Sequence, residues 1–177
     1  MSERLDELRL ENKRLKDQVQ NLEGKILSLV GNIEIKSSGG PNTKNLVNDR
    51  LLNLINSTTD QLNILAPKID RFYTTELKKL AESGVAVLII TKDRGSIPEE
   101  YQQYYDELKK TDGISIVNNP RVKFLLVFNT DEAVYSGGTL DKDELEESIL
   151  IVTIIKEQSK LRKVTEIFSL LLPSFMR

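Results

Sequence analysis

The stretch Pro120 to Gly138, PRVKFLLVFNTDEAVYSGG, is the part of the chain on which the fold prediction depends most. Its residues Phe124 to Phe128 form a continuous apolar run, which is typical of a strand covered on both faces. Residues 129–131, Asn-Thr-Asp, have the chemistry of a turn, and Ala133 to Ser136 has the composition of a second strand. The pair Gly137–Gly138 ends that strand. We therefore expect two strands joined by a short turn.

Outward from this pair, the periodicity of apolar residues predicts strands that alternate with helices. The expected strands are residues 61–66, 85–91, 113–118 and 148–155. The expected helices are residues 46–57, 70–83, 98–110 and 156–172, with an acidic turn or short helix at 141–147. This order predicts an α/β domain with a mixed, largely buried sheet and helices on both of its faces.

The N-terminal residues follow a different period, in which apolar residues are spaced alternately three and four apart. The stripe consists of Leu5, Leu8, Asn12, Leu15, Val19, Leu22, Ile26, Leu29 and Ile33. Such a stripe is the a/d seam of a coiled coil, and Leu at d with one Asn at a favours a parallel dimer. The alternatives are a lone amphipathic helix packed on its own domain and a DNA-reading zipper, although no basic block precedes the stripe.

The residues after the stripe, KSSGGPNTKN at 36–45, predict a flexible linker because Ser, Gly, Pro and Asn break regular structure. The expected organisation is therefore a coiled coil at residues 1–35, a linker at 36–45 and one α/β domain at 46–177.

The composition excludes several classes of chemistry. The chain has no Cys and no His, which excludes disulfides, thiol nucleophiles, imidazole catalysis and zinc sites built on these residues. Its net charge of −2 implies no general attraction to nucleic acid or membranes. A charged N-terminus and the lack of a membrane-length apolar run lead us to expect a cytoplasmic protein without a membrane segment. We expect no cofactor and no metal, and the acidic run at 141–147 lacks the glycine and ligand spacing of a calcium loop.

Several segments of the chain resemble one half of the phospholipase D superfamily. The segments that carry the resemblance are LNILAP, LKKLAESGVAVLIIT, ISIVNNPRVKFLLVFNTDEAVYSGGTL and ESILIVT, within residues 46–172. The third resembles the strand with the H-x-K-x4-D signature, followed by a hairpin and a glycine-serine turn. The resemblance implies a phospholipase D-like fold for this part of the chain.

Carried over by position, the nucleophilic histidine of the signature falls on Arg121, its lysine on Lys123 and its aspartate on Phe128. The serine and asparagine after the turn fall on Gly138 and Leu140. Because a guanidinium cannot replace histidine as a nucleophile, the resemblance implies that the domain is not an enzyme. It is also similar to the effector-domain core of archaeal TrmB-type transcription regulators, in which a coiled coil precedes a phospholipase D-like domain; no winged helix is expected before the coil.

One candidate ligand site follows from these residues. Arg121 and Lys123 lie two apart, so on a strand they share one face and can bind an anion. The other candidate donors are the side chains or amides of Ser136, Gly137, Gly138 and Thr139. The alternative is that a neighbouring carboxylate neutralises Lys123 and that Arg121 is solvated.

The favoured function is a non-enzymatic, homodimeric regulatory or scaffolding protein that binds a small anionic or sugar ligand, or a protein partner. The alternative is a TrmB-type, nucleic-acid-associated regulator that acts through a partner or through its locally basic last helix. A third hypothesis, a degenerate enzyme with residual hydrolase activity, conflicts with the lack of histidine.

Overall fold

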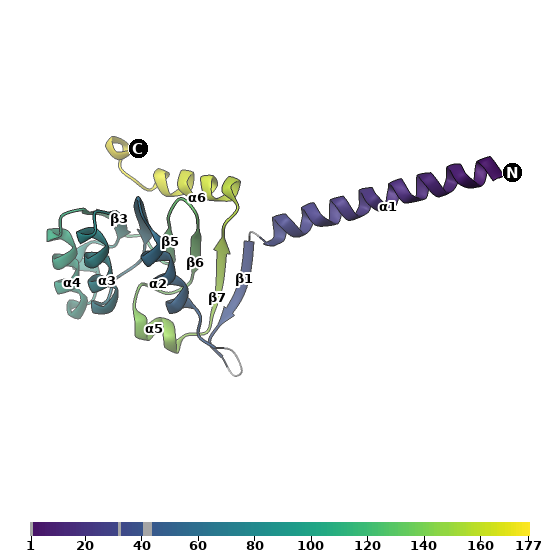
Figure 1. Cartoon of the computed structure of the whole chain (residues 1–177). Helices are drawn as coiled ribbons and strands as arrows, with labels where there is room; N and C mark the ends of the chain where they lie inside the picture. The colour runs from purple at the N-terminus through teal and green to yellow at the C-terminus, as the bar shows by residue number, and fades with distance from the viewer. Residues whose placement is uncertain (1, 32, 41–43) are drawn as a thin grey trace.

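The computed structural model describes residues 2–31, 33–40 and 44–177, and shows a long N-terminal helix that leads into an α/β domain (Figure 1). The helices are α1 (Ser2–Gly31), α2 (Val47–Ser57), α3 (Arg71–Glu82), α4 (Glu99–Lys110), α5 (Lys142–Glu147) and α6 (Gln158–Leu170). The strands are β1 (Ile33–Ser38), β2 (Gln61–Leu65), β3 (Ala86–Thr91), β4 (Ile114–Asn118), β5 (Leu125–Phe128), β6 (Ala133–Ser136) and β7 (Leu150–Ile155). No helix in the described part of the chain is long and apolar enough to cross a membrane.

Within the described residues, seven strands form one mixed sheet in the order β1-β7-β6-β5-β2-β3-β4. β2, β3 and β4 are parallel, and the helices α3 and α4 connect them in turn. The other neighbouring strands pair antiparallel, including the hairpin β5–β6. The mixed sheet expected from the sequence is thus confirmed, and both strands of the hairpin agree with their predicted positions to within one residue.

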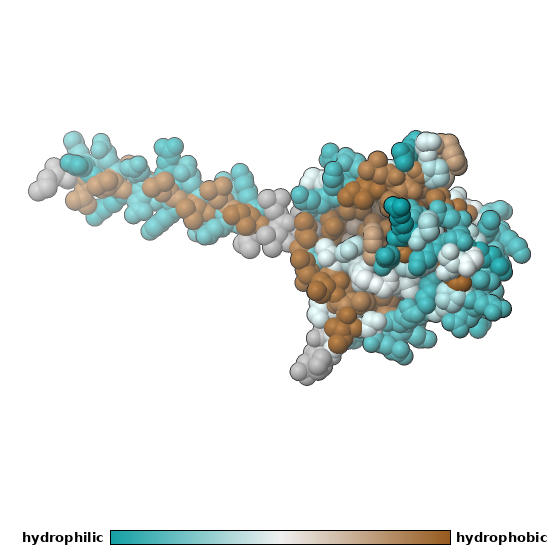
Figure 2. Space-filling view, turned by 180° about the vertical axis from the view of Figure 1, so that it is seen from behind, coloured by the Kyte–Doolittle hydropathy of each residue, from teal (hydrophilic) through white to brown (hydrophobic). Residues whose placement is uncertain are grey.

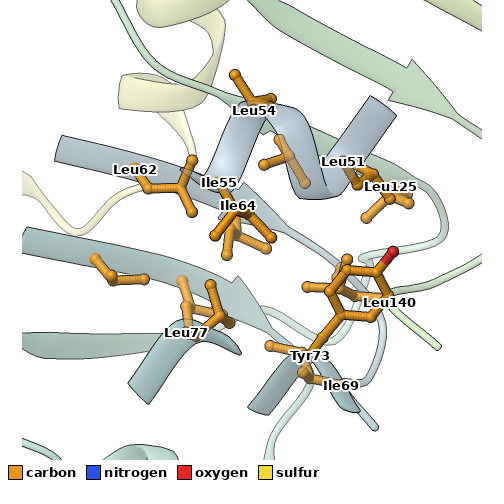
Figure 3. Close-up of a cluster of buried hydrophobic side chains, with 14 of the residues drawn as sticks. Leu51, Leu54, Ile55, Leu62, Ile64, Ile69, Tyr73, Leu77, Leu125 and Leu140 are labelled. Atoms are coloured by element: carbon orange, nitrogen blue, oxygen red, sulfur yellow. The ribbon is translucent and has the colours of Figure 1, made fainter. Parts of the chain in front are cut away.

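The main hydrophobic core lies between one face of the sheet and the helices α2, α3, α4 and α5 (Figure 3). Leu51, Leu54 and Ile55 of α2 meet Leu62 and Ile64 of β2, and all five are at most 1% exposed. In an α-helix, residues three or four apart share a face. The Leu51–Leu54–Ile55 spacing therefore presents one apolar stripe to the sheet.

The opposite face of the sheet carries a smaller core. Among the described helices, α6 packs on this face through Leu161 and Phe168, and Leu172 from the turn after α6 joins them. The ring of Phe168 lies edge-on to that of Phe128 in β5, with ring centroids 5.0 Å apart. β5 is buried on both faces as its apolar composition predicted.

The N-terminal boundary differs from the sequence prediction. The helix ends at Gly31, and residues 33–38, which were assigned to the coil and the linker, form β1 and pair antiparallel with β7. Ile33 and Ile35 alternate with Glu34 and Lys36, so this segment has the period of a strand. Ile33 also fits the last a position of the predicted seam, which is why the segment was assigned to the coil. Residues 41–43 of the expected linker lie outside the described residues.

Candidate functional site

The predicted ligand site lies at the edge of the sheet that is formed by the carboxyl ends of β2, β3 and β4. The register places the start of β5 beside the end of β2, and the end of β6 beside the start of β5, since Leu65 pairs with Leu126 and Leu125 with Ser136. The connections that follow these strands therefore meet at one edge, which is the place where open α/β sheets commonly bind ligands.

Arg121 and Lys123 lie on the connection from the end of β4 to the start of β5, at this edge. They are not on a strand, because β5 begins only at Leu125, so the prediction that they share a strand face was wrong. Pro120 cannot donate to a ladder, and the backbone N–H of Arg121 donates instead to Oδ1 of Asn119 at 2.9 Å. Both side chains are exposed, and within the described residues neither forms an ion pair.

Ser136 and Thr139 are not available as donors at this edge. Ser136 is fully buried on the α2–α5 side of the sheet, and its hydroxyl has no hydrogen-bond partner among the described residues. The Thr139 hydroxyl accepts from the backbone N–H of Lys68 at 2.9 Å and donates to the carbonyl oxygen of the same residue at 2.5 Å. Arg121, Lys123 and the exposed Gly137–Gly138 turn are the predicted site residues that still face solvent.

The connection after β2 is tied closely to the connection after β6, which the sequence did not predict. Besides the Thr139 contacts, the backbone N–H of Asp70 donates to the carbonyl oxygen of Leu140 at 3.0 Å. The Asp70 carboxylate caps α3 by accepting from the Tyr73 N–H at 2.8 Å, and its second oxygen accepts from the Lys142 N–H at 2.8 Å. One side chain thus holds the first turns of two helices, which fixes this part of the edge.

Burial changes the acidity of two groups behind these connections. Burial raises the pKa of the Asp70 carboxyl above its ordinary value, although the two N–H donors act in the opposite direction. Burial, and then the hydrogen bond that its hydroxyl donates to Asp141, raise the pKa of Tyr101 well above the usual range of a phenol. Tyr101 therefore stays a neutral donor at physiological pH.

A cleft of about 590 Å³ opens beside this network, between the N-terminal turns of α3, α4 and α5. Phe72, Tyr101 and Tyr104 form its apolar walls, and Arg71 and Lys142 lie among five carboxylates, from Asp70, Glu76, Glu100, Asp141 and Asp143. Sequence reasoning missed it because three helices far apart in the chain form it. The helix-capping positions of Asp70 and Asp141 were the available signal.

The second candidate site is the stripe along α1. Its described apolar members, Leu5, Leu8, Leu15, Val19, Leu22 and Ile26, are each between 51% and 58% exposed. Figure 2 shows them as an apolar band between polar flanks. Asn12 is also exposed, while the side chains of Leu29 and its neighbours at 27–31 lie outside the described residues. The helix thus presents to solvent the apolar stripe found in the sequence, and its pairing in a coiled coil stays a prediction.

Comparisons with known proteins give a structural likeness only. No protein-family model matches the chain, and no curated protein matches its sequence. Among solved structures, it is similar to Nuc from Salmonella typhimurium, a phospholipase D family member, with a TM-score of 0.64 and 14% identity over 77% of this chain and 92% of that one. The fold is phospholipase D-like. NucT from Helicobacter pylori gives a TM-score of 0.62 and 13% identity over 78% of this chain and 95% of NucT.

A third solved structure extends the likeness into the N-terminal helix. TrmBL2, an archaeal chromatin protein with a novel mode of DNA binding, is similar with a TM-score of 0.56 and 11% identity. That match covers 95% of this chain and 63% of TrmBL2. Because α1 is about a sixth of the sequence, 95% coverage requires most of the helix. The phospholipase D-like fold and the TrmB-like arrangement expected from the sequence are thus supported at the level of fold.

Proposed function

We propose that this chain is a non-enzymatic regulatory or scaffolding module in which a parallel coiled coil of α1 joins two phospholipase D-like domains. The observation that carries the proposal is the half-exposed apolar seam of α1, because the described part of the domain does not cover it. A second α1 covers such a seam by knobs-into-holes packing. Asn12 at an a position favours two helices in parallel and in register, since each Asn then meets its own copy.

The residues at the signature positions support a non-enzymatic role. A phosphohistidine intermediate requires histidine, and a homodimer of this chain contains none. Phe128 occupies the position of the signature's aspartate, and it is 2% exposed and packed on Phe168. Hydrolysis of a phosphodiester substrate that is lost in Lys123→Ala would contradict this part of the proposal.

Anion or sugar binding at the sheet edge rests on a smaller group of residues than the sequence suggested. Arg121 and Lys123 supply exposed charge, and the amides of the Gly137–Gly138 turn are the remaining donors. Phosphate, nucleotides and sugars would be titrated while thermal unfolding is followed. A ligand that raises the melting temperature of wild type and of Lys109→Ala, an exposed lysine on α4, but not of Lys123→Ala, would support the site. If none of the tested ligands behaves in this way, the proposed ligand site is ruled out.

The likeness to TrmBL2 favours one second candidate, a nucleic-acid-associated regulator. The likeness includes α1, and α6 carries the exposed cations Lys160, Arg162 and Lys163, of which Lys163 pairs with Glu166 at 3.5 Å. If α6 binds DNA directly, the protein should retard DNA in a gel, and the retardation should weaken as the salt concentration rises. It should also weaken in the double variant Lys160→Ala, Arg162→Ala. Retardation only in the presence of a co-purified protein would indicate action through a partner.

Parallel pairing of α1 can be tested by cross-linking, because the native chain has no cysteine. Leu8→Cys places a thiol at a d position near one end of the helix. A parallel, in-register pair brings the two copies of that thiol together, whereas an antiparallel pair puts them at opposite ends. We expect a covalent dimer of Leu8→Cys under mild oxidation and little of it with Leu10→Cys, which lies at the f position and is 69% exposed. Equal cross-linking of both variants would contradict the parallel coil.

A further inference from the structure

The face of the sheet under α6 is only partly covered. α6 packs over β5 and the start of β6, whereas Ile35 of β1 and Ile149 and Ile151 at β7 remain 71%, 73% and 72% exposed. The register places Ile35 opposite Thr153 and Ser37 opposite Ile151, so these side chains lie together on one face at the β1–β7 edge. Contiguous exposed apolar side chains of this kind mark interaction surfaces, unlike single ones.

The alternation along β1 indicates that this face is covered in the functional state. Ile33 and Ile35 point to the α6 side, and the charged Glu34 and Lys36 point to the side where α2 packs. A strand at the edge of a sheet ordinarily directs its apolar residues toward the core and its charged residues toward water. β1 therefore has the pattern of a strand whose open side is buried by another element.

The apolar surface continues from β7 to α6. Tyr135 of β6 pairs with Thr153 and lies against Phe124, with ring centroids 5.4 Å apart. Between these rings and α6 runs a groove of about 290 Å³ that has an entirely apolar lining, including Ile167 and Leu171. We call the surface formed by Ile35, Ile149, Ile151, Tyr135 and this groove the open face.

The position of the open face relative to α1 identifies its occupant. Figure 2 shows the apolar band of α1 and an apolar area beside it on the domain, both directed toward the same side of the molecule. A parallel coiled coil has its twofold axis along the two helices. Rotation about that axis turns the open face of each domain toward the open face of the other.

The chemistry of the open face also suits a second copy. In a twofold interface the same patch meets itself, so a charged patch would repel its own copy. The side chains that form the open face are uncharged, and the neighbouring Thr153 and Ser37 are neutral as well. We propose that the open face is a second interface between two copies of this chain, continuous with the coiled coil. This inference rests on the proposed dimer.

Cysteine variants of the full chain test the open face and the coil separately. Ile35→Cys and Ile151→Cys place thiols on the open face, Leu8→Cys reports on the coil, and Ser115→Cys lies exposed on the same side of the sheet but on β4, the opposite edge strand. Each variant would be treated with a short bismaleimide at low protein concentration. We expect cross-linked dimers from Ile35→Cys, Ile151→Cys and Leu8→Cys, and few from Ser115→Cys.

The outcomes separate the two proposals. If Leu8→Cys cross-links while both open-face thiols react no more than Ser115→Cys, the open-face interface is wrong and the coil stands. If only the open-face thiols cross-link, the coil is wrong and the interface stands. As an independent measurement, Ile151→Lys should raise the dimer dissociation constant at least about ten-fold and Ser115→Lys should not. Equal dimer dissociation constants for Ile151→Lys and Ser115→Lys would overturn the inference. Binding of the open face to lipid vesicles or to a different protein, in place of a second copy, would overturn it as well.

Discussion

Ser38, the last residue of β1, holds the start of a helix that begins nine residues later. Its hydroxyl oxygen accepts from the backbone N–H groups of Leu46 and Val47 at 2.9 Å and 3.2 Å, and it donates to Oδ1 of Asn45 at 3.3 Å. Leu46 occupies the N-cap of α2 and has no capping side chain of its own. The first turn of α2 therefore depends on a residue that the sequence assigned to a flexible linker.

The substitution Ser38→Ala should have a cost that can be worked out from these contacts. Ser38 is fully buried, so its removal leaves two N–H groups without an acceptor in a site where water cannot readily replace it. Loss of an N-cap hydroxyl costs about 0.5–2 kcal/mol, and an unsatisfied buried donor costs about 1–3 kcal/mol. We expect Ser38→Ala to lower the free energy of unfolding by about 2 kcal/mol, which for a chain of this size is about 4–8 °C in Tm.

Urea unfolding of the full chain measures this effect, with the protein concentration held constant because dimerisation adds to apparent stability. Ser37→Ala is the matched control, because Ser37 is exposed on the same strand and directed to the other face. A loss of less than about 0.5 kcal/mol in Ser38→Ala, or equal losses in the two variants, would refute the capping role.

Three further predictions concern the interior, the buried carboxyl and the turn after β1. Tyr73→Phe should cost about 1–2 kcal/mol in urea unfolding, because it removes the 2.6 Å hydrogen bond to Oδ1 of the buried Asn48. Burial raises the pKa of Asp70, so the folded protein binds that proton more tightly than the unfolded chain. Unfolding at a series of pH values should therefore show that wild type loses stability relative to Asp70→Asn as the pH rises from about 3.9 through the folded pKa. A gain in the relative stability of wild type over this range would contradict the raised pKa of Asp70. Gly39→Ala should destabilise more than Gly40→Ala in thermal unfolding, because both have positive φ but only at Gly39 would a Cβ lie 2.5 Å from a backbone oxygen.

Strands and helices with one clear period were predictable from the sequence. The runs that form β3 and β5 are apolar on both faces, and the stripes of α2 and α3 have helical spacing. β1 was missed because Ile33 satisfies two periods at once: it continues the heptads of α1, and it alternates with Glu34 as a strand residue. Only its pairing with β7, more than a hundred residues away, decides between them.

The candidate ligand site was predictable in its location but not in its donors. The chain order brings Arg121 and the Gly137–Gly138 turn to one edge of the sheet. Ser136 and Thr139 look like available hydroxyls in the sequence, yet strand alternation turns the first into the core and Lys68, 71 residues away, engages the second. Local periodicity does not contain such long-range contacts.

The molar mass of the protein in solution tests the central claim, dimerisation through the seam of α1, most directly. Wild type and the f-position control Leu10→Glu should have twice the chain mass of 20.1 kDa by light scattering. Leu8→Glu combined with Leu15→Glu removes four leucines per dimer that the coiled coil would bury. The expected loss of association free energy is about 4 kcal/mol, which is roughly a thousand-fold in dissociation constant. The double variant should therefore dissociate on dilution. A monomeric wild type, or a double variant that stays dimeric at every dilution at which wild type does, would contradict the account.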